Sequence, residues 1–353
     1  MHKVKVALGT RTYDIKIEKG LFAEIGTHVR QLSLAEKAAV VTDANVDALY
    51  GSLLQEKLEQ AGFAVRRIVM APGEQSKTLA TLGKVYGELA AFGLTRSDLV
   101  ITFGGGVPGD LGGFAAATFL RGVDFVQIPT TILAQIDSSV GGKVAIDLPE
   151  GKNLAGSFCQ PRGVLIDPEL LQTLPKRYLH DGLAEAVKYG CIRSEKLFSR
   201  LEAVVDDEAL LCGIEPIIEE CCAIKARIVE TDEFDTGERM LLNFGHTLGH
   251  AVEKCFNYEK YTHGEGVAIG MHMLTSRTED RGLTEKGTAR RLKSLLEKFE
   301  LPTEAVLPGG EVLATVGMDK KKKAQEITLV VIEGIGRGRL HKIPCAALPE
   351  YIL

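Results

Sequence analysis

The chain has 353 residues, 45% of them hydrophobic, and a formal net charge of −5. The length suits two domains of ordinary size, and the acidic balance argues against a general nucleic-acid or membrane binder. The N-terminus lacks the apolar segment of a secretory signal, and no uncharged apolar run is long enough to span a membrane. Seven cysteines without paired spacing indicate a reduced, cytoplasmic protein rather than a disulfide framework.

The first half of the chain alternates between two kinds of segment. Residues 3–18 show period-two alternation around Gly9-Thr10, which predicts a β-hairpin. Beyond it we expect strands at 38–43, 64–70, 98–103, 125–129 and 163–167, and helices at 46–61, 78–92 and 111–120. Strands that alternate with helices of this length predict a doubly wound α/β domain with a parallel sheet.

A glycine-rich turn, Gly104-Gly-Gly-Val-Pro-Gly-Asp110, follows the strand that ends at Phe103. Backbone N–H groups between a strand and a helix N-terminus favour phosphate. The letters satisfy G-x-G-x-x-G, but no acid ends the next strand at the distance that this fingerprint requires. Close packing of the glycines is the alternative. We favour a nucleotide phosphate because of the strand–glycine–helix context.

Polar residues follow the later strands of the same domain. Loops at one edge of a parallel sheet carry its ligand, so Asp137, Lys143, Lys152 and Asn153 are predicted site residues. The segment 135–143 is not a P-loop, because Asp137 stands where that motif needs glycine. We expect residues 151–153 to form a loop.

Helical periodicity dominates from Leu183 to about Phe299. We therefore divide the chain into an α/β nucleotide-binding domain, 1–174, and a mainly helical metal- and substrate-binding domain, 175–353. Residues 326–333 and 339–343 predict a second hairpin. The lysine run that starts at Lys320 is of a kind that is usually solvated.

Three histidines lie close together in the second domain. His246 and His250 are four residues apart and share a helix face, and His263 lies one loop away. Three imidazoles make up most of a zinc site, which one carboxylate would complete. Spacing leaves open whether the pair chelates together or one histidine binds while the other moves protons. For Glu185 and Lys188, three apart on one helix, an exposed ion pair is the simplest interpretation.

An ordered set of short motifs runs through nearly the whole chain. They are Pro72–Lys77, Gly104–Asp110, Arg121-Gly122, Pro129–Thr131, Gln135–Lys143, Gly151–Leu154, Gly182–Lys188, Asn243–His250, His263–Glu265 and Asp319–Lys321. Together they resemble the 3-dehydroquinate synthases of the sugar phosphate cyclase family. Pro108 departs from the branched aliphatic residue usual there, and it removes one potential N–H donor to the pyrophosphate.

The resemblance implies the following site. Zinc or cobalt(II) would bind Glu185, His246 and His263, which leaves His250 as an acid or phosphate contact. NAD would lie over the N-terminal sheet, and its contacts would be Asp43, Glu74, Lys77, Gly105, Gly106, Val107, Gly109, Asp110, Thr130, Thr131, Lys143, Lys152, Leu170, Leu171, Gln172 and Thr173. Substrate-contacting residues would be Asp137, Lys143, Lys152, Asn153, Lys188, Lys225, Arg239, Asn243, His250, Arg121 and Lys321, with the choice between Lys320 and Lys321 open.

The resemblance also implies an activity. The substrate would be the anionic sugar acid 3-deoxy-D-arabino-heptulosonate 7-phosphate, and the product 3-dehydroquinate. The active unit would be a homodimer in which Arg121 reaches the neighbouring subunit's site. Two alternatives are a metal- and NAD(P)-dependent polyol dehydrogenase and a related cyclase such as 2-deoxy-scyllo-inosose synthase.

Overall fold

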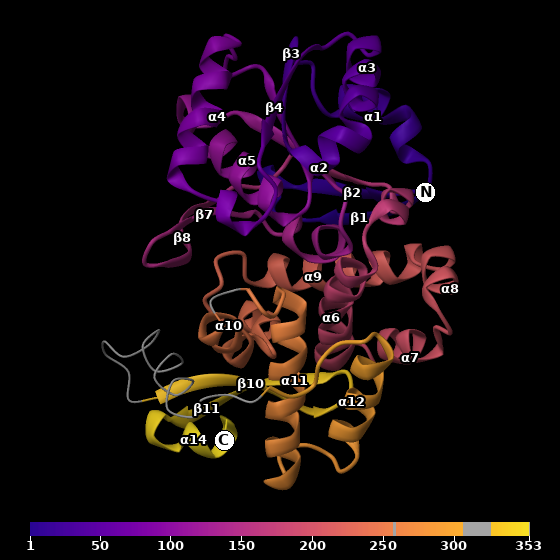
Figure 1. Cartoon of the computed structure of the whole chain (residues 1–353), viewed down its shortest axis with the longest axis vertical. Coiled ribbons are helices and arrows are strands. Elements are labelled where there is room, and N and C mark those ends of the chain that lie inside the picture. Colours follow the sequence, from indigo (N-terminus) through magenta and orange to yellow (C-terminus); the bar gives the residue numbers. More distant parts are fainter. Residues whose placement is uncertain (257–258, 306–325, 353) are drawn as a thin grey trace. The chain divides into compact units, whose positions relative to one another are not determined.

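The computed structural model describes residues 1–256, 259–305 and 326–352 (Figure 1). The chain divides into two compact units, Met1–Leu174 with Leu211–Phe234, and Pro175–Leu210 with Asp235–Leu353. The sequence predicts a single boundary at residue 174. The structure differs because helix α9 (Glu215–Thr231) packs against strands β1 (His2–Val6) and β2 (Tyr13–Ile17), which groups Lys225 with the first unit.

The first unit is built on a seven-stranded sheet of order β1-β2-β9-β6-β5-β3-β4. The other strands are β3 Lys37–Asp43, β4 Ala64–Met70, β5 Leu99–Gly104, β6 Asp124–Pro129 and β9 Gly163–Ile166. β1 and β2 form the predicted antiparallel hairpin, and every other neighbouring pair is parallel. The predicted parallel α/β sheet is confirmed.

Helices cover both faces of this sheet (Figure 1). Helices α1 (Ile25–Leu32) and α3 (Ser52–Gln60) pack on one face, and α4 (Leu79–Ala91) and α5 (Gly106–Thr118) pack on the other. Within β3, Val40 belongs to the first core and Val41 to the second, as the two-residue period of a strand requires. The shorter helices of this unit are η1 Gly9–Arg11, η2 Leu21–Glu24, α2 Ala44–Val46, η3 Asp47–Gly51, η4 Glu74–Ser76, η5 Phe119–Arg121, η6 Ala134–Ser138 and η7 Pro168–Thr173.

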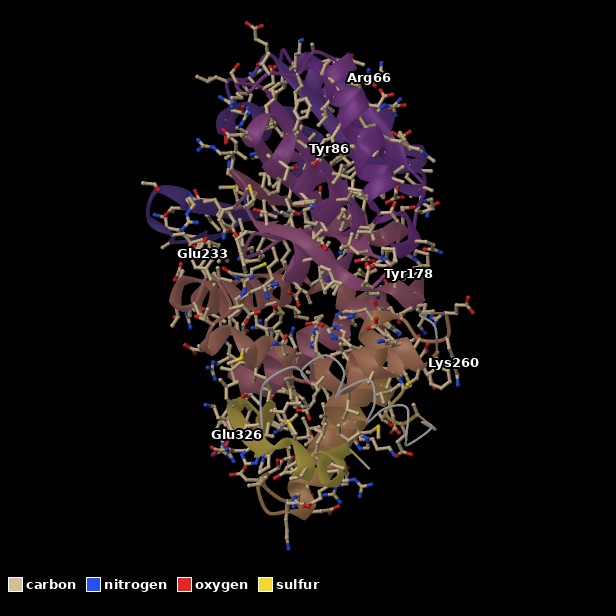
Figure 2. All side chains as sticks on the ribbon, turned by 90° about the vertical axis from the view of Figure 1, so that its left-hand side faces the viewer. Arg66, Tyr86, Tyr178, Glu233, Lys260 and Glu326 are labelled. Atoms are coloured by element: carbon tan, nitrogen blue, oxygen red, sulfur yellow. The ribbon has the colours of Figure 1, made fainter. Side chains whose placement is uncertain are left out.

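Strand β4 forms one edge of the sheet. Its Arg66 projects from the outer surface (Figure 2) and pairs with Glu88 of α4, with 2.6 Å between nitrogen and oxygen. A charged side chain on an edge strand discourages pairing with another sheet.

Two segments of the first unit differ from the sequence prediction. Helix α5 starts at Gly106 rather than Leu111. Its first turns consist of the poor helix formers of the glycine motif, so helix propensity did not mark them in the sequence. Lys152 and Asn153 lie in strand β8 (Gly151–Phe158), which pairs antiparallel with β7 (Lys143–Leu148), and not in a loop. The residues of β8 are mostly exposed, so no apolar alternation marks the strand in the sequence.

The second unit is mainly helical, as predicted, and carries the predicted C-terminal hairpin of β10 (Glu326–Gly334) and β11 (Arg337–Pro344). The helices after residue 175, apart from α9, are α6 Lys176–Arg193, α7 Glu195–Ala203, α8 Asp207–Cys212, η8 Glu238–Asn243, α10 His246–Cys255, α11 His263–Asp280, α12 Thr288–Lys298, η9 Cys345–Ala347 and α14 Pro349–Ile352. Every residue of α6 from Leu179 to Ile192 is buried, so this helix lies inside its unit.

Within the described part of the chain, every helix is too short or too polar to cross a membrane. All seven cysteines lie in that part, and none of them forms a disulfide there.

Candidate active site

The first unit places the glycine turn at the switch point of its sheet. From β3 the chain adds β4 on one side and then β5 on the other, so the carboxyl ends of β3 and β5 flank the position where ligands bind in such sheets. Asp43 ends β3, and a Cβ on Gly104 at the end of β5 would lie 3.3 Å from the Asp43 Oδ2 atom. Asp43 also caps α2, since its carboxylate accepts from the N–H of Asn45 at 2.9 Å.

The glycine turn lies against the segment that follows β6. The Thr130 N–H donates to the Gly104 carbonyl at 2.9 Å, and a Cβ on Gly105 would lie 3.1 Å from Thr131 Cγ2. Helix α5 has Gly105 as its N-cap with no side-chain cap. Pro108 is the third residue of α5, a position whose N–H has no partner within a helix. The backbone N–H groups of Gly105, Gly106 and Val107 are therefore the donors that this turn offers to an anion.

Other glycines of α5 serve packing. A Cβ on Gly112 would lie 2.8 Å from Thr102 Cγ2, and one on Gly113 would lie 2.5 Å from Val144 Cγ1. The two interpretations of the motif thus apply to different glycines: those at 105 and 106 line the turn, and those at 112 and 113 seat the helix on the sheet and on β7.

Lys77 brings together two residues that the sequence analysis assigns to different ligands. Its ammonium lies 2.5 Å from Asp110 Oδ2 and 2.5 Å from Asn153 Oδ1. Burial opposes its charge, but the Asp110 and Glu74 carboxylates outweigh that effect and raise the pKa of Lys77. Asn153 has a φ of +56°, in the left-handed region that asparagine enters more readily than other non-glycine residues. Its N–H is held by Asp147 at 2.7 Å.

A second buried ammonium lies in the same unit. Lys225 of α9 is only 6% exposed. Its ammonium contacts the Asp137 carboxylate and donates to the Asp137 carbonyl at 2.8 Å. The fold therefore joins two predicted substrate residues that are 88 positions apart in the chain.

The remaining predicted residues of the first unit are more scattered. Lys143 and Lys152 lie on the β7–β8 hairpin. Leu170 and Leu171 are buried, whereas Gln172 and Thr173 are exposed. Leu170 belongs to the hydrophobic core, so packing alone accounts for its burial. Arg121 is exposed at the end of η5, the short helix after α5, and both Leu120 and Arg121 have positive φ values.

In the second unit, Glu185, His246 and His263 converge. Glu185 Oε1 lies 3.4 Å from His246 Nε2 and 3.5 Å from His263 Nε2. Four ligands at about 2.1 Å from a tetrahedral zinc ion lie about 3.4 Å from one another. Glu185 is fully buried, and neither of its oxygens makes a hydrogen bond of ordinary geometry with a described residue, although the Lys188 ammonium contacts Oε2. The donor set and its spacing fit a divalent metal.

Hydrogen bonds to the other ring nitrogens orient both imidazoles. His246 Nδ1 lies 3.2 Å from the Phe244 carbonyl, and His263 Nδ1 lies 3.0 Å from Glu253 Oε1. Both partners are acceptors, so each Nδ1 carries a proton, and each Nε2 is the ring nitrogen that faces Glu185.

Electrostatics distinguish the two rings in the metal-free chain. Burial, with the charge of Lys188 next, lowers the pKa of His246 well below its usual value and keeps that ring neutral. Burial also opposes a charge on His263, but the neighbouring Glu185 and Glu253 carboxylates outweigh that effect and raise its pKa to about 10. A metal therefore has to displace a proton from His263 Nε2.

Close approach of three helices places these ligands. A Cβ on Gly264, the second residue of α11, would lie 1.9 Å from the backbone oxygen of Asp181 in α6. The Asp181 carboxylate accepts from the Gly264 N–H at 2.6 Å, which fixes the start of α11 one turn from Glu185 on α6. Between α10 and α11, a Cβ on Gly249 would lie 2.9 Å from the Gly266 carbonyl carbon. Glycines at these crossings are what bring the histidines to Glu185.

A second group in the same place can also hold a metal. His250, Glu253 and His263 each offer a ligand atom within 4.8 Å of the others, as Glu185, His246 and His263 do. Glu253 was not predicted as a site residue, although it lies seven residues after His246, on the same helix face. We favour the group with Glu185 because the bonds at Nδ1 turn Nε2 of both rings toward it.

The other predicted residues of this unit differ in burial. Lys188 and Arg239 are buried, at 1% and 2% exposed, whereas His250 and Asn243 are exposed. The His250 ring centroid lies 5.4 Å from that of His246. Lys320 and Lys321 lie outside the described residues.

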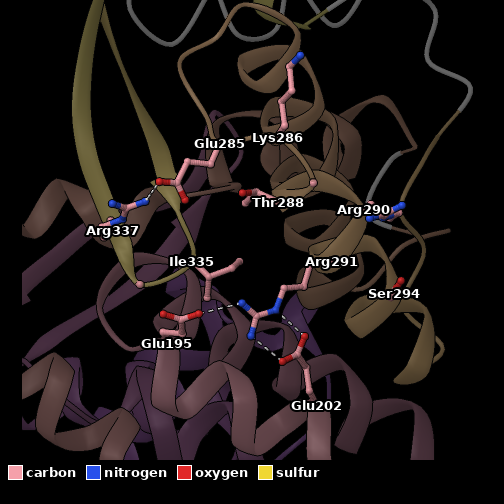
Figure 3. A pocket seen from close by; sticks show the side chains of 12 residues that line it. Glu195, Glu202, Glu285, Lys286, Thr288, Arg290, Arg291, Ser294, Ile335 and Arg337 are labelled. Carbon is pink, nitrogen blue, oxygen red and sulfur yellow. Dashed lines mark hydrogen bonds and ion pairs between the residues drawn. The ribbon is translucent and has the colours of Figure 1, made fainter.

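A large open cavity of about 1060 Å³ lies elsewhere in the second unit, between α7, α12 and the β10–β11 turn (Figure 3). Several of its charged side chains pair with one another. Arg291 binds Glu195 at 3.0 Å and Glu202 at 2.8 Å, and Arg337 contacts Glu285. None of its lining residues belongs to the metal cluster, and we assign the chemistry to the cluster because of its converging ligand atoms.

Solved structures share this fold. The chain aligns with a 2-deoxy-scyllo-inosose synthase, described as a complex with carbaglucose-6-phosphate, NAD⁺ and Co²⁺, at a TM-score of 0.89 and 22% identity, covering 99% of both chains. It aligns with a 2-epi-5-epi-valiolone synthase from Streptomyces hygroscopicus, described with NAD⁺ and Zn²⁺ bound, at a TM-score of 0.85 and 25% identity, covering 98% of this chain and 97% of the other. The fold is that of the sugar phosphate cyclases.

Sequence comparison is more specific. Residues 67–181 match the family described as 3-dehydroquinate synthase N-terminal, and residues 182–322 match 3-dehydroquinate synthase C-terminal. The chain is 48% identical over 353 residues to a 3-dehydroquinate synthase from Clostridium acetobutylicum, covering 100% of this chain and 99% of that protein. The chain belongs to the 3-dehydroquinate synthase family.

Proposed function

We propose that this chain is an enzyme that converts 3-deoxy-D-arabino-heptulosonate 7-phosphate to 3-dehydroquinate and phosphate. The reaction consists of transient oxidation, β-elimination of phosphate, re-reduction and aldol cyclisation. The observation that carries the proposal is the full-length similarity to 3-dehydroquinate synthase. The geometry of the candidate nucleotide site in the first unit and of the candidate metal site in the second supports it.

NAD would bind at the switch point of the first unit. The N–H groups of Gly105, Gly106 and Val107 would face the pyrophosphate, and Asp43 would accept from the ribose or adenine. Thr130 and Thr131 adjoin the turn and would line the nicotinamide half. The similarity of the chain to proteins crystallised with NAD⁺ supports this assignment.

Glu185, His246 and His263 would hold a divalent metal, zinc or cobalt. When bound, the metal would supply a Lewis acid that lowers the pKa of a substrate hydroxyl, and NAD would supply a reversible hydride acceptor. The second-unit side chains orient the substrate for these steps. Arg239 has a planar fork that suits the substrate carboxylate, and His250 is exposed next to the cluster and would exchange a proton.

The substrate carries two anionic groups, and the protein has a net charge of −5. Cations must therefore be concentrated locally. Lys143, Lys152, Lys188 and Lys225 are the described lysines that we assign to this role, with Lys321 as a further phosphate contact. The Lys225–Asp137 and Lys188–Glu185 pairs keep two of these ammonium groups in fixed positions.

We propose that the active unit is a homodimer. Leu120 and Arg121 have φ values of 50° and 69°, and a run of strained non-glycine residues is retained where function requires the geometry. Arg121 is exposed there and would enter the site of a second subunit. A cytoplasmic location is proposed on the absence of disulfides among the seven cysteines.

An assay with a catalytic amount of NAD tests the activity. Purified protein, zinc or cobalt(II), the heptulosonate phosphate and sub-stoichiometric NAD should release one phosphate for each 3-dehydroquinate formed, without accumulation of NADH. Growth of NADH absorbance in step with product would indicate a polyol dehydrogenase. Turnover of a sugar phosphate that lacks a carboxylate, but not of the heptulosonate, would indicate a related cyclase.

A further inference from the structure

Glu253 is a buried carboxylate beside the metal cluster that the proposed chemistry does not use. It lies on α10, is 2% exposed, and contacts His263 Nδ1 at 3.0 Å. Burying a carboxylate costs free energy unless it is paired, so we expect this side chain to have a specific role.

The crossing of α10 and α11 fixes where this carboxylate lies (Figure 1). A Cβ on Gly249 would lie 2.9 Å from the carbonyl carbon of Gly266, and a Cβ on Gly266 would lie 3.3 Å from Glu253 Cγ. Because neither glycine has a side chain, the Glu253 side chain lies directly over the first turn of α11, where His263 begins the helix.

The two imidazoles of the cluster are held in different ways. A backbone carbonyl accepts from His246 Nδ1, whereas a charged side chain accepts from His263 Nδ1. The orientation of the His263 ring therefore depends on the Glu253 side chain, which a substitution can remove. A carboxylate at Nδ1 both selects the tautomer with a lone pair on Nε2 and makes that nitrogen a stronger ligand.

We propose that Glu253 is a positioning residue that holds His263 as a metal ligand and strengthens its bond to the metal. The proposal rests on the metal site assigned above. Glu253 acts through Nδ1 of His263, while Nε2 faces Glu185 at 3.5 Å. It is not itself a ligand in this arrangement, although it belongs to the second possible metal group with His250 and His263.

Titration of the metal-free protein with Co²⁺, followed by its visible absorption, tests the proposal without reference to turnover. Glu253→Ala should lower Co²⁺ affinity toward a hundredfold, and Glu253→Gln should lower it about tenfold. The glutamine keeps an oxygen that can accept the Nδ1 proton but loses the charge. If the alanine variant does not fold, the glutamine variant decides.

Asp98→Asn is the matched control, since Asp98 is a buried carboxylate of the first unit, 5% exposed, that bonds Thr95 and Lys37 and no histidine. It should lose stability and keep wild-type Co²⁺ affinity. Wild-type affinity in Glu253→Gln would overturn the proposal. Complete loss of Co²⁺ in both Glu253→Gln and His250→Ala would overturn it too, by making Glu253 a ligand. If His263→Ala bound Co²⁺ normally, the metal site itself would be wrong.

Discussion

Replacing Gly264 with alanine tests how the fold places His263. A Cβ there would lie 1.9 Å from the Asp181 backbone oxygen and 2.7 Å from its Oδ1 atom. Since the nearest atom is backbone, either α6 or the start of α11 has to move. Any such movement also disturbs the 2.6 Å bond from the Gly264 N–H to the Asp181 carboxylate.

Three effects determine how much Gly264→Ala changes the free energy of unfolding. Alanine is a better helix former than glycine by about 1 kcal/mol. Overpacking costs about 1–3 kcal/mol, and losing a hydrogen bond to a charged group costs about 1.5–3 kcal/mol. The clash and the lost bond outweigh the propensity gain, so the free energy of unfolding should fall by about 1.5–5 kcal/mol. Metal affinity should fall with it, because His263 is the neighbouring residue.

Urea unfolding of the metal-free protein and Co²⁺ titration measure the two effects. The matched control is Gly83→Ala in α4, where an added Cβ meets nothing within 4 Å. That variant should gain about 0.5–1 kcal/mol and bind Co²⁺ normally. The reasoning is refuted if Gly264→Ala is as stable as the wild type and binds metal equally well.

The remaining predictions concern substrate binding, acid stability and assembly. Arg239→Lys keeps the charge but loses the fork, so kcat/KM should fall about tenfold to a thousandfold, and an unchanged value would remove Arg239 from the carboxylate site. Asp98→Asn should cost about 1.5–3 kcal/mol at neutral pH, because the Asp98 carboxylate accepts from the Thr95 N–H and hydroxyl, both at 2.7 Å. Burial opposes its charge, but these bonds keep the pKa of Asp98 below its usual value. Its stabilisation is therefore present above the unfolded pKa of about 3.9 and is lost as the pH falls through the folded pKa. The difference in unfolding free energy between the two proteins should shrink steadily as the pH falls below about 4, and a difference that does not shrink would contradict the assignment. Arg121→Ala and Lys188→Ala should each be inactive alone, and co-expressed they should regain about a quarter of wild-type activity, because half the dimers are mixed and half their sites are intact. Mixed dimers without activity would show that Arg121 does not serve a neighbouring site.

The sequence predicted the strands of the seven-stranded sheet and the helices α3, α4 and α5 because their periodicities are clear, but it did not predict helix α1 or strands β7 and β8. Two of the other differences have a physical reason that lies outside the local sequence. Residues Gly106–Asp110 are intrinsically poor helix formers, and only packing on the sheet makes them the first turns of α5. Helix α9 reads as part of the helical half of the chain, and its packing on β1 and β2 depends on contacts between residues far apart in sequence.

The metal cluster shows the same limit. The four-residue spacing of His246 and His250 predicted a shared helix face, which the structure confirms in α10. Spacing alone did not reveal which nitrogen of each ring faces Glu185, because that follows from the Phe244 carbonyl, Glu253 and the glycine crossings. Glu253 was within reach of sequence reasoning, as it follows His246 at a helical spacing of seven.

Metal content of single variants tests the central claim most directly. Elemental analysis after dialysis against zinc should show about one zinc per subunit in the wild type and in His250→Ala, with zinc lost from Glu185→Gln and His246→Ala. Zinc lost from His250→Ala but retained in Glu185→Gln and His246→Ala would place the metal at His250, Glu253 and His263 and contradict the account.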